Sequence, residues 1–323
     1  MGVMSLAEIM DKSIEVLRKY IKTILLFTLA YGVIFIGIII ISIIIVSILA
    51  AITARVFLGP VGVGFIFSLW FFLIVAFSLA SNIGMIKISS QEFLGESVYV
   101  DNALKDTFKS IIKVLGIVAM VTIIFIPVMA IFSGIIYFLY RSFQGPLFTF
   151  GAYGVKQIIS IVFLIITILA AIIAIIAYIT LFSFSLQAVA IENKGVIKAL
   201  QRSYELVKGD YLKIFGCIIL FGVTIYAIRV SLDSFVALAS SIIYLFAKFL
   251  NLGGSYSVFI GKVVADFQWP LSLLSWLVIT PIGTIMITLL YFNQRFKKEG
   301  YDISLNLKKI EKNEERKQVS EIV

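Results

Sequence analysis

The chain has 323 residues, of which 61% are hydrophobic and only 14% charged, and this excludes an ordinary soluble domain, which is about half apolar and a quarter charged. It contains no histidine and one cysteine, which excludes an internal disulfide, a histidine-based catalytic triad and a Cys/His zinc cluster. The formal net charge of +9 would suggest nucleic-acid binding in a soluble protein, but in so apolar a chain it bears on membrane topology, and no nucleic-acid partner is expected.

Six segments of the sequence are apolar enough to cross a bilayer, which takes a helix of about 20 residues. Five of them contain no Asp, Glu, Lys or Arg over at least 27 residues: 23–54, 56–86, 114–140, 157–191 and 267–294. The other is 214–232, with 15 uncharged residues before Arg229. The first segment is too long for the apolar part of a signal peptide, which has about 7–15 residues, so we expect a retained anchor. The sequence therefore predicts an all-α polytopic membrane protein with six transmembrane helices.

The basic residues predict the side of the membrane on which each connecting segment lies. Four alternate segments contain 21 of the 27 Lys and Arg residues: 1–22, 87–113, 192–213 and 295–323. The three segments between them contain the other six. Because the cytoplasmic segments of membrane proteins are enriched in Lys and Arg, this asymmetry predicts that both termini are cytoplasmic.

The cytoplasmic segment before each odd-numbered span has the same apolar spacing. Steps of 4, 3 and 4 residues recur at Met10, Ile14, Leu17 and Ile21, at Leu104, Phe108, Ile111 and Leu115, and at Leu200, Tyr204, Val207 and Tyr211. These steps place four side chains on one helical face, so each segment is predicted to form an amphipathic helix. The apolar face either lies in the inner leaflet of the membrane or packs on neighbouring spans. Ser5 and Glu8 predict a capping-box start for the first of these helices.

These amphipathic helices, with the hairpins that follow them, predict an internal repeat. Ser13, Thr107 and Ser203 occupy equivalent positions in the three segments. The outer turns are also alike, with Gly59-Pro60 in the first unit and Gly145-Pro146 in the second. The predicted fold is therefore three copies of an amphipathic elbow helix plus a transmembrane hairpin. The predicted divisions are a six-span domain, 1–300, with repeats at about 5–86, 101–191 and 196–294, and a charged cytoplasmic tail, 301–323.

Two segments resemble a known membrane family. They are ALQRSYELVKGDY at 199–211, followed by Ile214-Phe215-Gly216, and LYFNQRFKKEGYD at 290–302. They resemble a six-span family that is also found as the membrane domain fused to some glycerophosphoryl diester phosphodiesterases. The resemblance implies six spans, a prokaryotic plasma membrane and no established activity for the membrane part alone. That family commonly has an Asp where this chain has Asn293, so no role of that carboxylate carries over. The phosphodiesterase barrel is expected to be absent, because neither the length nor the histidine-free sequence accommodates it.

Three carboxamides near the cytoplasmic ends of the returning spans form the first candidate site. Asn82, Gln187 and Asn293 are separated by 105 and 106 residues, so they occupy equivalent positions in the predicted repeats. They either line a polar vestibule at the inner face of the membrane, with neighbouring serines adding hydroxyls, or make ordinary hydrogen bonds between helices. An unpaired amide is costly to bury in lipid, which favours an orientation toward the bundle interior and predicts that the three approach one another.

Two further features of the spans are candidates for a functional role, namely a charged pair and two prolines. Arg229 and Asp233 are four residues apart on a helix and are predicted to form an ion pair at the outer membrane surface. Pro127 and Pro281 lie within spans, where a missing backbone donor favours a kink. Such a kink serves either as a hinge or as a plain packing feature.

The sequence disfavours enzymatic function and predicts no cofactor and no metal site. Apart from Asp233, no Asp or Glu lies in the body of a span, which removes the carboxylate relay of proton-coupled transporters. No phosphate-binding loop, dinucleotide fingerprint or paired acid and base is present. We therefore expect a non-enzymatic plasma-membrane protein that acts in lipid or envelope homeostasis, with membrane lipids as partners, or serves as the membrane subunit of a protein partner. The alternative is a passive permease or the membrane subunit of an exporter.

Single cysteines test the predicted topology. With Cys217 replaced, Ser257→Cys lies in a predicted outer segment and Ser320→Cys in the predicted cytoplasmic tail. In intact cells a membrane-impermeant thiol reagent is expected to label the first variant and not the second, because the reagent reaches only the outer segments. Labelling of Ser320→Cys without labelling of Ser257→Cys would mean that the orientation is inverted.

Overall fold

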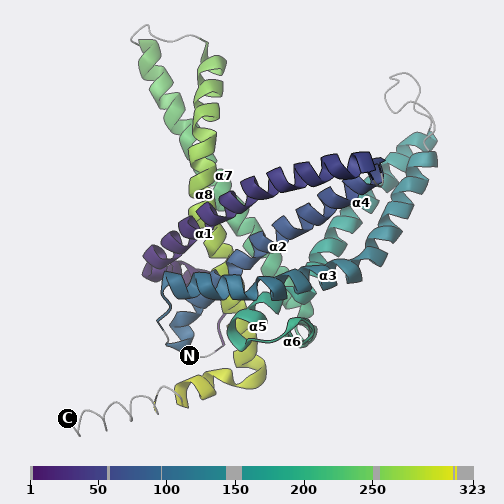
Figure 1. Ribbon diagram of the computed structural model, residues 1–323. Helices are drawn as coiled ribbons and strands as arrows, with labels where there is room; N and C mark the ends of the chain where they lie inside the picture. Colours follow the sequence, from purple (N-terminus) through teal and green to yellow (C-terminus); the bar gives the residue numbers. More distant parts are fainter. Residues whose placement is uncertain are drawn as a thin grey trace.

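The computed structural model of the chain describes residues 3–56, 59–95, 97–142, 155–249, 255–307 and 310 (Figure 1). The described residues form helices and no strand. Six helical segments are long and apolar enough to cross a membrane, which confirms the predicted all-α polytopic fold. The helices are α1 Leu6–Val56, α2 Gly59–Leu94, α3 Val100–Ser142, α4 Val155–Phe182, α5 Ser185–Glu192, α6 Val196–Lys208, α7 Tyr211–Phe249 and α8 Tyr256–Glu299.

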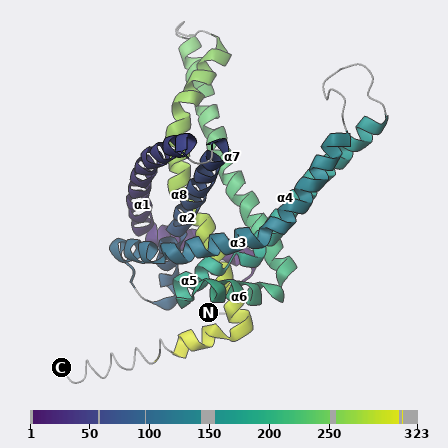
Figure 2. The same cartoon turned by 45° about the vertical axis from the view of Figure 1, so that its right-hand side comes forward.

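Three helical hairpins radiate from a shared base (Figures 1 and 2). The hairpins are α1–α2, α3–α4 and α7–α8, and the short helices α5 and α6 lie in the base. The largest fully buried side chains gather there, and the rings of Phe93 and Phe292 stack with centroids 4.5 Å apart. The outer halves of the hairpins expose large apolar side chains such as Ile36 and Phe65, which are 58% and 70% exposed. Apolar surface of this kind suits contact with lipid.

The four segments predicted to be cytoplasmic meet at this base. Polar contacts join each of them to the next, so segments that the charge asymmetry assigns to one side of the membrane lie side by side. The contacts are Lys19 with Glu92 at 2.6 Å, Lys113 with the carbonyl of Asn193 at 3.3 Å, and Lys297 with Asp210 at 2.7 Å.

The first helix begins as the sequence predicts. The backbone N–H of Ser5 donates to Glu8 Oε2 at 2.6 Å, and the backbone N–H of Glu8 donates to Ser5 Oγ at 3.3 Å. These reciprocal bonds satisfy two donors that the first turn of a helix leaves without intrahelical partners. The predicted capping box is therefore confirmed.

Two of the three predicted elbow segments are set off from the spans that follow. In α1 the backbone leaves the helical conformation at Tyr20, where φ is −109° and ψ is 16°. The third elbow segment is the separate helix α6, and Gly209 and Asp210 lie between α6 and α7. The second is continuous with its span, because α3 is one helix from its first residue to its last. The threefold repeat stays a prediction.

The apolar faces of the predicted amphipathic helices are divided between the core and the surface. The third residue of the spacing is buried in the first and third segments, with Leu17 and Val207 at 8% and 0% exposure. The second residue stays exposed in all three, with Ile14, Phe108 and Tyr204 at 48%, 38% and 45% exposure. One edge of the face therefore packs on the spans, and the other edge is accessible to lipid.

The three hydroxyl residues at equivalent positions share one kind of environment. Ser13, Thr107 and Ser203 are fully buried, and each hydroxyl donates to a main-chain carbonyl. Ser13 and Thr107 bond within their own helices, to Met10 at 2.6 Å and Ala103 at 2.7 Å. Ser203 instead reaches another helix, which bears on the candidate site described below.

The predicted kinks at Pro127 and Pro281 do not divide their helices. α3 continues through Pro127, and α8 continues through both Pro270 and Pro281. In membranes, neighbouring helices and nearby hydroxyls compensate for the hydrogen bond that a proline removes. A hinge at either position stays a prediction.

The first residues of the predicted tail pack on α8. Gly300 follows the helix with φ at 59°, the left-handed conformation that ends many helices. Residues 301–307 are helical, and Leu305 is 8% exposed. The centroid of the Tyr301 ring lies 3.6 Å from the guanidinium carbon Cζ of Arg295. Of the rest of the predicted tail, 308–323, only Ile310 is described.

Helix α2 packs closely on α1 and α3 at Gly84. A Cβ atom at this position would lie 2.2 Å from Phe27 Cζ and 2.7 Å from Thr107 Oγ1, and both of those side chains are fully buried. Gly84→Ala is therefore expected to cost about 1–3 kcal/mol of stability through overpacking. The measurement is the midpoint at which detergent-solubilised protein loses its monodisperse size-exclusion peak on heating.

Gly64→Ala, on the same helix, is the matched control. No atom lies within 4 Å of the corresponding Cβ position, and alanine favours a helix over glycine, so this variant is expected to equal or exceed the original protein in stability. Equal midpoints for the two variants would contradict the close packing at Gly84.

Candidate functional site

The fourth membrane span is broken near the base. α4 ends at Phe182 and α5 begins at Ser185, and between them Phe184 has φ −95° and ψ 2°. A break in a membrane helix frees backbone donors and acceptors, which must then be satisfied by other protein groups or by water. The break therefore marks a place where the protein itself replaces lipid around the chain.

Ser203 of α6 satisfies two backbone groups at this break. Its hydroxyl donates to the carbonyl of Leu181 at 2.8 Å and accepts the N–H of Phe184 at 3.0 Å. The hydroxyl of Tyr211, at the start of α7, donates to the carbonyl of Ala177 at 3.0 Å. Two polar side chains from outside the span thus bind its backbone, Ser203 at the break and Tyr211 in the part of α4 just before it.

A cavity of about 410 Å³, here named the inner cavity, lies beside the break. Helices α2, α3, α4, α5, α7 and α8 and the break itself all contribute to its wall. Most of the wall consists of apolar side chains: Leu79, Ile86, Ile117, Val118, Val121, Ile179, Phe182, Leu186, Ile218 and Ile287. The polar side chains on the wall are Asn82, Thr122, Ser183, Ser185, Gln187 and Thr284.

Two of the three predicted carboxamides lie on the inner cavity. The hydroxyl of Thr284 donates to Asn82 Oδ1 at 2.8 Å, and Asn82 Nδ2 donates to the carbonyl of Leu79 at 3.2 Å. Gln187 is only 3% exposed, and its Oε1 accepts no hydrogen bond from the described residues. A buried acceptor without a donor costs about 1–3 kcal/mol, so a hydrogen-bond donor that reached this oxygen would be stabilised there.

Asn293 does not join the other two carboxamides. Its Oδ1 accepts the backbone N–H of Met4 at 2.7 Å, and its Nδ2 donates to the carbonyl of Met4 at 3.0 Å. A primary amide offers one acceptor and donors in the same plane, so it pairs with a peptide unit in this reciprocal way. The side chain therefore fastens the N-terminal segment to α8 and is absent from the described wall of the inner cavity.

Glu192, the last residue of α5, holds a cluster of basic groups in the base. Its Oε1 lies 3.1 Å from Nε of Arg202 and 3.6 Å from Nη1 of Arg295, and its Oε2 lies 2.8 Å from Nζ of Lys194. The hydroxyl of Tyr291 also donates to Oε1. The side chains of the two arginines and of Glu192 are only 10–15% exposed. Hydrogen bonds between ionised groups are roughly twice as strong as neutral ones, so this cluster ties α5 firmly to α6 and α8.

Glu299 completes the cluster as a ring of ion pairs, here named the ion-pair ring. It lies 2.5 Å from Arg202 Nη2 and 3.0 Å from Arg295 Nε. Each arginine thus contacts both Glu192 and Glu299, and the four charges balance. A guanidinium group suits this arrangement because its planar set of donors can bind two carboxylates at once.

Two lysines also join the end of α8 to α6 and to the turn that follows α6. Lys298 donates to the carbonyls of Glu205 and Leu206 in the last turn of α6, at 3.0 and 2.8 Å, where a positive charge is favoured by the helix dipole. Lys297 lies 2.7 Å from Asp210, and the hydrogen bond from this lysine holds the pKa of Asp210 below its usual value. These contacts fix α8 relative to α6.

Arg229 and Asp233 lie on α7, as predicted. The Arg229 side chain is exposed and lines a groove of about 420 Å³ with Trp276 and Thr280 of α8. The side chain of Asp233 is outside the part of the chain whose side chains the structure describes. The predicted ion pair stays a prediction.

No protein-family model, curated protein or solved structure matches this chain. The resemblance of 199–211 and 290–302 to the phosphodiesterase-associated membrane family therefore stays an expectation. Among the described residues, no group of three or more Cys, Asp or Glu side chains is placed to hold a metal ion.

The ion-pair ring generates a stability prediction. Glu192→Gln leaves Arg202 and Arg295 with Glu299 as their one carboxylate in the ring, so two partly buried positive charges lose half of their compensation. We expect the free energy of unfolding to fall by about 2–4 kcal/mol. Breaking a fully buried ion pair usually costs about 3–5 kcal/mol, and the cost is somewhat lower here because these side chains are partly exposed. Thermal unfolding in detergent measures the change.

Glu205→Gln is the matched control on the adjacent helix. Glu205 is exposed, and its carboxylate makes no ion pair with the described residues, so this variant is expected to change stability by less than about 0.5 kcal/mol. If both variants unfolded at the same temperature, the ring would have no special part in stability.

Proposed function

We propose that this chain is a non-enzymatic integral membrane protein of the prokaryotic plasma membrane that holds a lipid-like molecule in the inner cavity as part of lipid or envelope homeostasis. We further propose that it is related to the six-span family that its two motifs resemble. One observation carries the first proposal: the wall of an apolar cavity includes Gln187, a buried carboxamide whose Oε1 accepts no hydrogen bond from the described residues.

The size and wall of the cavity support an amphipathic ligand. About 410 Å³ falls within the range of about 300–1,000 Å³ that is usual for small-molecule sites. The alkyl wall favours a ligand with an apolar body, because the transfer of apolar surface from water into an apolar cavity is favourable. Gln187 Oε1 accepts only from a donor, so the polar end of the ligand must carry a hydroxyl or an N–H group. A lipid with a glycerol hydroxyl or an amino headgroup has this chemistry.

The same wall argues against a proton-coupled transporter. No Asp, Glu, Lys or Arg lines the inner cavity among the described residues, so no side chain on this wall takes up and releases a proton. A passive permease or an exporter subunit is the second candidate, and the broken fourth span favours it, because broken helices recur at the substrate sites of membrane transporters. A permease needs the cavity to join a continuous water path, which a transport assay tests directly.

Lipid retention after purification tests the proposal. The protein is extracted in mild detergent, and bound lipid is identified and counted by native mass spectrometry. Val118→Trp places a large ring into the cavity and is expected to lower the retained lipid at least about fivefold, because the ring takes up the space of the ligand. Gln187→Leu is expected to reduce selectively those lipids that carry a hydroxyl or N–H donor.

Val33→Trp is the control for the added bulk. Val33 is 69% exposed on α1 and is not on the wall of the inner cavity, so this variant should retain lipid like the original protein. Equal retention by Val118→Trp and Val33→Trp would refute the proposal. Solute flux through protein-containing liposomes that Val118→Trp blocks would establish the permease instead.

A further inference from the structure

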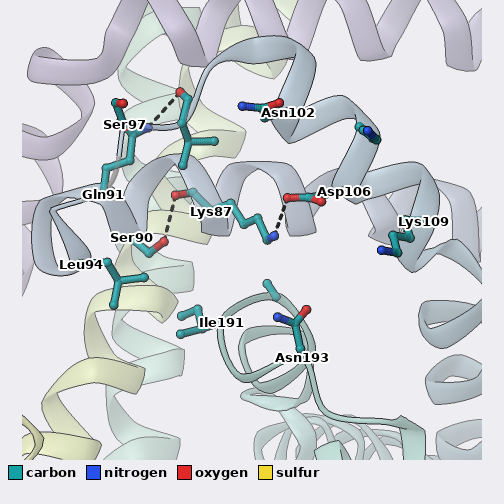
Figure 3. A pocket seen from close by; sticks show the side chains of 13 residues that line it. Lys87, Ser90, Gln91, Leu94, Ser97, Asn102, Asp106, Lys109, Ile191 and Asn193 are labelled. Carbon is teal, nitrogen blue, oxygen red and sulfur yellow. Dashed lines mark hydrogen bonds and ion pairs between the residues drawn. The ribbon is translucent and has the colours of Figure 1, made fainter.

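A second cavity in the base differs in chemistry from the inner cavity. It has a volume of about 520 Å³ and lies between the end of α2, the start of α3 and the end of α5 (Figure 3). Its wall carries three lysines, Lys87, Lys105 and Lys109, and one carboxylate, Asp106. Here it is named the basic pocket. None of its wall residues is shared with the inner cavity, so the inference below stands whether or not that cavity holds a lipid.

The described charges of the basic pocket do not balance. Lys87 is paired with Asp106 across the pocket, as Figure 3 shows. Lys105 and Lys109 form no ion pair and no hydrogen bond with the described residues, and both are exposed. They are four residues apart on one face of α3, where like charges repel by about 0.2–0.5 kcal/mol. An anion between them would remove this repulsion and supply the missing counter-charge.

Neutral donors stand beside the two lysines. Ser97, three residues before α3, and Asn102, in its first turn, lie on the pocket wall. The first backbone N–H groups of a helix add a partial positive charge at its start. Asn193 completes the opposite side of the pocket in Figure 3. Lysine ammonium groups with hydroxyl and amide donors are the set that binds phosphate oxygens. A carboxylate has only two oxygens to share among these donors, whereas a phosphate monoester has three free oxygens and a phosphodiester has two free oxygens and two ester oxygens.

Exposed apolar side chains lie near the two lysines on α3. Phe108 and Ile112, on the same helix as the two free lysines, are 38% and 80% exposed. An amphipathic helix of this kind lies in the membrane interface with its apolar residues below the headgroups and its lysines at their level. The phosphate of an anionic lipid would then stand at the height of Lys105 and Lys109.

We propose that the basic pocket binds a phosphate group through Lys105 and Lys109. The same chemistry is offered by an anionic phospholipid headgroup and by a soluble phosphate compound. Binding requires no change in the fold, because the wall is formed by helices that the base already holds together. The sequence showed the basic segment 87–113, but not the pocket, since Lys87, Lys105 and Asn193 come together only through packing of three helices.

The test compares two double variants in the full chain. Lys105→Gln with Lys109→Gln removes the charges of the pocket. Arg18→Gln with Lys22→Gln removes an exposed basic pair of the same spacing on α1, outside the pocket. Each protein is placed in nanodiscs that contain phosphatidylcholine with about one fifth phosphatidylglycerol, and the enrichment of the anionic lipid around the protein is measured by native mass spectrometry. In a second arm, inorganic phosphate and glycerol phosphate are titrated into protein in neutral nanodiscs.

The pocket variant is expected to lose at least about fivefold in anion binding in one of the two arms, which is the effect of about 1 kcal/mol for one lysine near an anionic surface. The α1 variant is expected to keep its binding. Loss in the nanodisc arm alone identifies a lipid headgroup, and loss in the second arm identifies a soluble phosphate. Asn102→Asp, which adds a carboxylate to the pocket wall without removing a lysine, is expected to weaken binding in the same arm. No binding in either arm, or an equal effect of both double variants, would overturn the proposal.

Discussion

The contact between Glu192 and Arg202 is the interaction on which the base of the molecule depends, because it fixes a helix that could not stand alone. α5 has eight residues, too few for a stable isolated helix. Two consecutive residues of α6 hold it at its two ends: Ser203 bonds to Phe184 at its start, and Arg202 pairs with Glu192 at its end. The break before α5 is therefore stabilised by α6, which bonds to the backbone at the break through Ser203 and holds the far end of α5 through Arg202. Since Gln187 lies between these ends, its place on the inner cavity depends on the same contacts.

Residues that are adjacent in the sequence line different cavities of the base. Ile86 is fully buried and lies on the wall of the inner cavity, whereas Lys87, the next residue of α2, lies on the wall of the basic pocket. α5 does the same, with Gln187 on the first cavity and Ala190 and Ile191 on the second. Neighbouring helical residues point about 100° apart, so two helices suffice to divide apolar from cationic space. A molecule with an apolar part and a phosphate part matches this pair of environments in kind.

The elements that could be predicted from the sequence depend on local composition, and those that could not depend on contacts between distant residues. Long uncharged runs are enough to predict the spans, and Ser5 with Glu8 is enough to predict a cap. The break at Phe184 was not predictable, because residues 182–185 contain no proline or glycine and are compatible with a continuous helix. The two hydrogen bonds that stabilise the break come from Ser203, which is 19 residues from Phe184. The common repeat position of the carboxamides suggested one shared role, but Asn293 has a different partner in Met4. The ion-pair ring joins residues up to 107 positions apart, from Glu192 to Glu299, and no spacing reveals it.

The pairing of Met4 with Asn293 has a consequence for biosynthesis. The two residues are 289 positions apart, and a ribosome adds about 5–20 residues each second, so the N-terminal segment emerges about 15–60 s before its partner exists. During that interval the backbone groups of Met4 must be bonded to water or to another protein. The base can close only when the last helix has entered the membrane. A ribosome that stalls before α8 would therefore leave an open base with an unfastened N-terminus, a form that a quality-control protease could distinguish from the finished protein.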